Sequence, residues 1–230
     1  MKGNAPAPPP AFARLRRATA WSRRSPKGGG GKRRLRRREG AARERIETGL
    51  AESAYVKHLL LRRCVPQIEA IAAAATKALR AGRRVFLFGN GGSAADAQHI
   101  AGELEGRFKR ERRALPVLSL TTNTSTLTAI GNDFGYEKTF ARQVEAHVRR
   151  GDVVIAISTS GNSPNVLEAV KAAKKAGAIV AGFTNEKGGK LRKAADLCLT
   201  VPSTDTQRVQ ECHIAAGHVM CDAVETALFG

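Results

Sequence analysis

The sequence predicts an α/β protein in which a parallel sheet of five strands lies between layers of helices. The first observation is a set of five short apolar runs that do not alternate with polar residues, as is typical of strands buried on both faces. The second is that helix-like segments separate these runs, an order that favours a parallel sheet with right-handed crossovers. The expected strands are residues 85–88, 115–120, 153–157, 179–183 and 197–201.

The helices are predicted from apolar residues that recur with helical spacing. Two of them precede the first strand, and Pro66 is suited to the first turn of the second helix. The others lie between the strands, where crossover connections are needed. The expected helices are residues 47–63, 66–81, 93–107, 137–149 and 163–176.

The composition fits one such domain. With 230 residues, of which 42% are apolar, the chain is able to bury the core of one α/β domain. Four cysteines without a CxxC pair argue against a disulfide framework and a cysteine zinc ribbon, and predict buried thiols in a reducing compartment. Aromatic residues make up 5%, which argues against a base-stacking surface for RNA. No apolar run reaches the roughly 18 residues of a membrane span.

The positive charge is concentrated at the N-terminus. The net charge is +19, and residues 1–45 hold 15 Lys or Arg against 2 Glu. Because little apolar surface is available there, we expect a basic, disordered leader at 1–45 and a folded domain at 46–230. The leader has the composition of a non-specific polyanion binder or an organelle transit peptide. A tail without function, or an upstream start codon that was wrongly included, explains the same residues. We expect no specific nucleic-acid partner.

Glycine and polar residues follow the first expected strand, at the end of a parallel sheet where ligands bind. Residues 89–93 read Gly-Asn-Gly-Gly-Ser, and glycines let the backbone approach a ligand closely. Ser93 with Asp96 three residues later resembles a helix capping box. The Lys-Ser/Thr ending of a Walker loop is absent. Bare glycine-rich turns are also common between a strand and a helix, so ligand binding stays open at this point.

Hydroxyl groups follow the third expected strand. Residues 158–164 read Ser-Thr-Ser-Gly-Asn-Ser-Pro, and Pro164 is placed as the first residue of a helix. Hydroxyls and backbone N–H groups at a helix N-terminus suit a phosphate dianion. Serine-rich loops are often only solvated turns, but the position after a buried strand favours a phosphate-binding loop.

Two segments carry candidate metal ligands. His99 and Glu103 lie four residues apart and share one helix face, either as ligands or as a simple ion pair. The expected C-terminal helix carries Gln210, His213 and His218. By spacing alone Gln210 and His213 are the closer pair, because Gln210 and His218 would lie about 80° apart around a helix and roughly 12 Å along it. Glutamine is a poor default ligand and core histidines are common, so the residues themselves leave a zinc site open.

Five short blocks carry a resemblance to a known family. They are Gly-Asn-Gly-Gly-Ser at 89–93, Ala-Gln-His at 97–99, Gly-Asn-Asp-Phe-Gly at 131–135, Ser-Thr-Ser-Gly-Asn-Ser at 158–163 and Arg-Val-Gln-Glu-Cys-His at 208–213. In this order they resemble the phosphoheptose isomerases of the sugar-isomerase (SIS) domain family. Each block is modest alone, and the five together are highly specific. The resemblance covers about residues 46–230, which is nearly everything except the leader.

The resemblance implies a single SIS domain with a flavodoxin-like three-layer sandwich, in a cytoplasmic homotetramer. It implies an aldose–ketose isomerase that converts sedoheptulose 7-phosphate to D-glycero-D-manno-heptose 7-phosphate, the first step of heptose biosynthesis for lipopolysaccharide or other surface glycans. One Zn²⁺ per subunit is implied, with ligands at His99, Glu103, Gln210 and His218. The implied substrate contacts are Asn90, Gly91, Gly92, Ser93, Glu103, Asn132, Asp133, Ser158, Thr159, Ser160, Ser163 and Gln210.

The residue types fit this chemistry. Aldose–ketose isomerisation moves a proton between adjacent carbons through an enediol, and one carboxylate, here Glu103, is able to serve both carbons. His218 would exchange a proton with the sugar oxygens, and Zn²⁺ would stabilise the developing charge. The resemblance thus selects His218, and His213 is expected to be structural.

Two features depart from the family pattern. The basic leader has no counterpart in it, and Gln207 stands where some relatives carry an acidic residue. The family also contains a non-catalytic tetrameric scaffold that binds a replication initiator protein and lacks the carboxylate and the final histidine. Because this chain has both Glu103 and His218, the enzyme is favoured. A sugar-phosphate-sensing regulator would need a DNA-binding module, and residues 1–45 are too short and too rich in Gly and Pro for one.

Overall fold

The computed structural model describes residues 31–230, so residues 1–30 of the expected leader lie outside the described residues. The chain divides into two compact units, one that ends at Tyr55 and one from Val56 to Gly230. Their boundary falls inside helix α2 (Gly31–Arg63), which begins further toward the N-terminus than predicted. The added part of the helix is rich in Arg, Glu and Ala. These residues favour a helix locally even where little apolar surface is available for packing.

One sheet of parallel strands forms the centre of the second unit, with the order β2-β1-β3-β4-β5, and confirms the predicted five-stranded parallel sheet. β1 pairs with β2 on one side and β3 on the other, so that Val85 lies opposite both Val117 and Val153. β2 is shorter than predicted and lies at the edge of the sheet, where a single neighbour pairs with it. The strands are β1 (Val85–Gly89), β2 (Val117–Ser119), β3 (Val153–Ile157), β4 (Ile179–Asn185) and β5 (Leu197–Val201).

Helices connect the strands, as the alternating pattern predicted. Pro66 and Pro164 both lie in first turns, where the missing N–H of proline has no helical partner to lose. Two helices were not predicted, because the described side chains of α5 include none that is buried and α8 has six residues. The helices of this unit are α3 (Val65–Arg80), α4 (Gly92–Glu105), α5 (Thr124–Phe134), α6 (Thr139–His147), α7 (Pro164–Lys175), α8 (Gly189–Ala194) and α9 (Thr206–Phe229).

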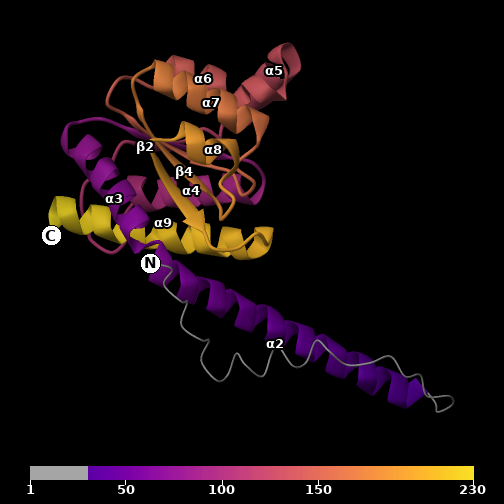
Figure 1. The fold of residues 1–230 in the computed structure, drawn as a ribbon. Helices are drawn as coiled ribbons and strands as arrows, with labels where there is room; N and C mark the ends of the chain where they lie inside the picture. The colour runs from indigo at the N-terminus through magenta and orange to yellow at the C-terminus, as the bar shows by residue number, and fades with distance from the viewer. Residues whose placement is uncertain (1–30) are drawn as a thin grey trace, which may run out of the picture. The chain divides into compact units, whose positions relative to one another are not determined.

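Helices lie on both faces of the sheet (Figure 1), and one apolar core fills the space on each face. Alternate residues of β1 point to opposite faces, so Leu87 packs in one core while Phe86 and Phe88 pack in the other. Helices α3, α4 and α9 cover the first face, and α6, α7 and α8 cover the second. This is the three-layer arrangement that the resemblance implied. Among the described residues, no helix has both the length and the apolar character needed to cross a bilayer.

The strand order reverses direction between β1 and β3. In parallel sheets a ligand crevice opens beyond the carboxyl ends of the two strands at such a point. The loop after β1 meets the start of α7, directly after the β3 loop, because Nδ2 of Asn90 donates a hydrogen bond to Oδ1 of Asn165 at 2.8 Å. The fold therefore brings together the two loops that the sequence indicated for ligand binding.

Candidate active site

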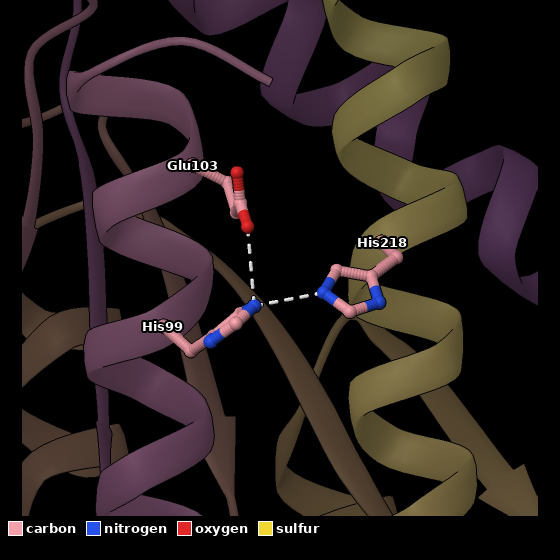
Figure 2. Close-up of side chains that lie close together, drawn as sticks. All are labelled: His99, Glu103 and His218. Carbon is pink, nitrogen blue, oxygen red and sulfur yellow. Dashed lines mark hydrogen bonds and ion pairs between the residues drawn. The ribbon is translucent and has the colours of Figure 1, made fainter. Parts of the chain in front are cut away.

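Two histidines and one glutamate converge between helices α4 and α9 (Figure 2). His99 and Glu103 project from α4, one turn apart, and His218 faces them from α9. Nε2 of His99 lies 3.1 Å from Oε1 of Glu103 and 2.8 Å from Nε2 of His218. Candidate ligand atoms from the three residues all lie within 4.8 Å of one another. The sequence predicted the shared face of His99 and Glu103, and the fold adds His218 to them.

Close packing of α4 against α9 makes this convergence possible. A Cβ atom added at Gly217, next to His218, would lie 2.5 Å from Cδ1 of Ile100, next to His99. Ile100 is completely buried, so it has little room to move. Gly217 therefore allows the separation at which the cluster forms. Phe108, in the segment after α4, stacks on the His218 ring with the ring centroids 5.8 Å apart.

The donor set of the cluster fits a divalent metal such as zinc. Two imidazole nitrogens and one carboxylate oxygen are a common set of three protein ligands that leaves a position for water or substrate. The rings of His99 and His218 face each other through Nε2, so one ring must donate a proton to the other. A cation between them would bind both nitrogens unprotonated. The His99 side chain is 49% exposed and that of Glu103 is 25% exposed, so solvent and substrate have access.

The other expected ligand and the competing histidine lie earlier on α9. The Gln210 amide faces the first residue of α4, where a Cβ added at Gly92 would lie 2.5 Å from its Nε2. Its role as a metal ligand stays a prediction. His213 is completely buried, with Nε2 3.3 Å from the carbonyl oxygen of Thr184, and burial lowers the pKa of its ring to about 4. In the described part of the chain, the structure groups His218, and not His213, with the two residues of α4.

The loop between β3 and α7 gathers hydroxyl groups at the start of a helix. The oxygens of Ser158 and Ser163 lie 3.0 Å apart. Ser163 is the residue before the first turn of α7, and its side chain makes no capping hydrogen bond. Pro164 has no N–H, and Oδ1 of Asn165 accepts a hydrogen bond from the N–H of Val166 at 3.0 Å, so hydroxyls are the main donors that this loop offers to an anion. Oγ of Ser160 accepts a hydrogen bond from the N–H of Asn162, so its own proton remains available for donation. The geometry suits phosphate, and phosphate binding stays a prediction here.

The remaining expected substrate contacts are gathered only in part. Asn90 lies at the junction of the two loops, and the Tyr136 hydroxyl donates a hydrogen bond to its Oδ1 atom at 3.1 Å. Sequence reasoning did not single out Tyr136, although it directly follows the Gly-Asn-Asp-Phe-Gly block. Asn132 and Asp133 are exposed near the end of α5 and hydrogen-bond each other at 2.9 Å. Their contact with a substrate stays a prediction.

Ser93 and Asp96 do not form the capping box that the sequence suggested. Gly91, with a φ of 55°, takes the position before α4, and none of the described side chains caps the helix there. Ser93 is therefore already inside the helix, and the capping-box interpretation is wrong. Asp96 is half-buried instead, and its Oδ2 atom has no hydrogen-bond partner within the described part of the chain. Burial raises the pKa of this carboxyl to about 6, although nearby His99 acts in the opposite direction.

Known proteins resemble this chain in sequence. A family model described as the SIS domain matches residues 53–185. A phosphoheptose isomerase of Rhodospirillum rubrum is 57% identical over 165 residues, which span 72% of this chain and 88% of that protein. A phosphoheptose isomerase of Aquifex aeolicus is 53% identical over 182 residues, which span 79% of this chain and 95% of that protein.

Solved structures resemble the fold as well. A phosphoheptose isomerase of Neisseria gonorrhoeae matches with a TM-score of 0.77 and 42% identity, over 80% of this chain and 99% of that one. One from Francisella tularensis matches with a TM-score of 0.78 and 34% identity, over 80% of this chain and 98% of that one. The matches thus span nearly the full length of these relatives. The chain therefore belongs to the SIS domain family and, within it, to the phosphoheptose isomerases.

Proposed function

We propose that this protein converts sedoheptulose 7-phosphate to D-glycero-D-manno-heptose 7-phosphate with the help of one Zn²⁺ per subunit. Membership of the family makes the chain a sugar-phosphate isomerase. The observation that carries the finer proposal is the convergence of His99, Glu103 and His218, which offers both a base and a metal-binding donor set. Zn²⁺, when bound, supplies a Lewis acid that polarises the sugar oxygens.

Glu103 is the group that we assign to proton transfer on carbon. Its carboxylate takes a proton from one of two adjacent carbons and returns it to the other, with an enediol between the two steps. The side chain is partly exposed beside His99, so a bound sugar is able to reach it. His218 faces it from the other helix and exchanges a proton with the sugar oxygens, which also helps to open the ring.

The loops after β1 and β3 are assigned to the sugar phosphate. Ser158, Ser160 and Ser163 supply hydroxyl donors, and the loop that carries them lies at the positive end of the α7 dipole. The glycines at 91 and 92 let the sugar approach the backbone at the start of α4. His99 and Glu103 follow on α4 itself, so we assign the phosphate to these loops and the reacting carbons to the cluster on α4 and α9.

The experiment that tests the chemistry compares Glu103→Gln with the wild type in a coupled assay on sedoheptulose 7-phosphate. Gln keeps the volume and removes the base, so kcat should fall by about 10²–10⁴-fold. Glu105→Gln, at an exposed position of the same helix, is the matched control and should keep its activity. Chelation should abolish turnover, and added Zn²⁺ should restore it. Full activity of Glu103→Gln contradicts the mechanism, and a wild type that binds the sugar phosphate without turnover indicates the scaffold function instead.

We also propose that the protein is a homotetramer in which another copy covers an apolar groove. The groove has a volume of about 1120 Å³ and is lined mainly by apolar side chains of α3, α9 and the end of α2. Leu61 and Val219 line it and are 64% and 55% exposed. Contiguous apolar surface of this kind is typical of an interface. Leu61→Glu should lower the mass measured by ultracentrifugation, whereas Leu118→Glu, exposed on the edge strand, should not; a monomeric wild type refutes the proposal.

In the cell we place this reaction in the cytoplasm, as the first step of heptose biosynthesis for lipopolysaccharide or other surface glycans. The support is the family membership together with cysteines that form no disulfide among the described residues. Deletion of the gene should remove heptose from the surface glycan. Unchanged heptose in the deletion strain contradicts this assignment. The division into a leader at 1–45 and a catalytic domain at 46–230 stays a prediction.

A further inference from the structure

We propose that Arg112, Glu225 and Phe108 position His218 relative to His99 and Glu103 and thereby hold the metal-binding geometry of the cluster. This inference rests on the proposed function of that cluster. Arg112 and Phe108 belong to the segment between α4 and β2, and Glu225 lies near the end of α9. All three act as positioning residues.

Arg112 binds the end of the helix that carries two of the cluster residues. Its side chain is 1% exposed, and Nη2 donates a hydrogen bond to the backbone carbonyl oxygen of Glu103 at 3.0 Å. Nη1 donates to the carbonyl oxygen of Gly106 at 2.7 Å. Carbonyl groups at the end of a helix lack partners inside it. Arg112 supplies such partners here and so fixes the backbone of Glu103.

Glu225 binds the same segment from α9. Nε of Arg112 donates to Oε1 of Glu225 at 3.0 Å, and the Glu225 side chain is completely buried. The carboxylate also accepts hydrogen bonds from the backbone N–H groups of Phe108, Lys109 and Arg110, at 3.2, 2.8 and 2.9 Å. One carboxylate therefore anchors four donors of the segment after α4 onto α9.

The anchored segment places Phe108 on the His218 ring. Glu225 lies seven residues after His218, about two helical turns, so both residues lie on the same side of α9. The Phe108 ring stacks on that of His218 at 5.8 Å, and Nε2 of His218 faces His99 (Figure 2). The Phe108 ring against one face of the His218 imidazole restricts the rotation of that imidazole. Contacts that orient metal-binding histidines act on metal affinity in this way.

Stability alone does not explain the buried pair. Desolvation of two buried charges offsets much of their attraction, and apolar replacements of similar volume are often as stable. Apolar side chains cannot supply the directional hydrogen bonds that join the backbone of Glu103, through Arg112 and Glu225, to α9. The pair is therefore suited to fix one helix of the cluster relative to the other.

The test compares zinc affinity and turnover among variants of these residues. The double variant Arg112→Met/Glu225→Leu removes both charges together, so no unpaired charge stays buried. It also leaves the backbone groups that the two side chains bind without these partners, so its folding is measured first. Phe108→Leu leaves both charges in place, and Phe108→Tyr keeps the aromatic ring. Asp222→Asn is the matched control, because Asp222 pairs with Lys109 at 2.9 Å and joins the same segment to α9 at the exposed surface.

We expect the double variant and Phe108→Leu to bind Zn²⁺ about 10- to 100-fold more weakly than the wild type, as is typical when residues that orient metal ligands are changed. Zinc affinity is measured on metal-free protein by competition with a chromophoric chelator, independently of turnover. At saturating zinc, kcat should fall while KM for sedoheptulose 7-phosphate stays unchanged, because the phosphate loop is intact. Phe108→Tyr and Asp222→Asn should match the wild type.

Wild-type zinc affinity and kcat in Phe108→Leu, or in a folded double variant, overturn this inference and leave the proposed function standing. If the double variant does not fold, Phe108→Leu decides: weakened zinc binding with rescue by Phe108→Tyr supports the inference, and unchanged binding overturns it. A wild type that neither binds zinc nor isomerises the sugar overturns the proposed function, and this inference with it.

Discussion

Substitutions at His213 and His218 should have opposite consequences, because one histidine is a buried core residue and the other lies in the metal-binding cluster. His213 is completely buried against Phe183, and its Nε2 atom lies 3.3 Å from the carbonyl oxygen of Thr184. His213→Gln should therefore lower the free energy of unfolding and leave zinc content unchanged. His218→Gln should lower zinc content and kcat and leave stability nearly unchanged in metal-free protein.

The buried, neutral ring of His213 also makes the stability of the wild type depend on pH. Burial lowers the pKa of His213 from 6.5 to about 4, so between these values the unfolded chain binds a proton that the native chain does not. The contribution to stability is therefore fully present above pH 6.5 and is lost as the pH falls toward 4. The gap between the two pKa values corresponds to a loss of about 3 kcal/mol. Gln does not take up this proton, so His213→Gln should lack that part of the pH dependence.

Urea unfolding of metal-free wild type and His213→Gln, between about pH 8 and pH 5, measures the difference. At the upper end the variant should be less stable by about 1–3 kcal/mol, because its buried polar contacts are altered. An equal pH slope in both proteins would show that His213 is not buried in its neutral form. If His213→Gln loses zinc and turnover while His218→Gln keeps both, the two histidines must exchange their assignments.

Two further substitutions examine the phosphate loop and the buried carboxyl of α4. Ser160→Ala should raise KM for the sugar phosphate, because it deletes a donor to a charged acceptor worth about 1.5–3 kcal/mol; an unchanged KM in steady-state kinetics argues against the loop assignment. Asp96→Asn should stabilise the metal-free protein above pH 6 and not near pH 4, because burial raises the pKa of Asp96 from 3.8 to about 6 and the native state disfavours its charged form. Urea unfolding measures the free energy of unfolding of both proteins. A variant less stable than the wild type above pH 6 would contradict this prediction and show that the carboxylate has a favourable partner.

The strands were predictable because their residues are mostly apolar, and those of β1 and β3 are all buried. β3 and β5 have the predicted bounds, Val153–Ile157 and Leu197–Val201. The errors fall at the edge strand β2, in helix α5, where no described side chain is buried, and at the charged start of α2, whose sequence has little apolar character. The spacing of apolar residues indicates which side chains are buried, so a helix with little apolar surface is not predicted from that spacing.

Local spacing predicted one half of the cluster and not the other. His99 and Glu103 share a helix face because four residues make about one turn. The choice between His213 and His218 depends on how α9 is rotated against α4, which tertiary packing decides and spacing within α9 does not. The resemblance to the family supplied His218, and the structure brings that residue to the pair.

The positioning residues left no local signal in the sequence. Arg112 and Glu225 lie 113 residues apart, and each reads by itself as an ordinary charged residue. Their burial became visible only in the folded chain. Charged residues that are completely buried and fully hydrogen-bonded are rare, so their position between two helices of the site is informative where their spacing is not.

The two parts of the candidate site depend on contacts of different range. The phosphate loop at 158–163 lies within one strand–loop–helix unit, and β3 and α7 fix its backbone. The cluster joins His99 to His218, 119 residues apart, and it forms only where α9 packs on α4. A small displacement of one helix against the other therefore changes the positions of the metal-binding and proton-transferring groups while the phosphate loop keeps its geometry. Substitutions along that contact should change zinc affinity and kcat while KM is still unaltered, which makes the helix contact a more sensitive probe of the chemistry than the loop.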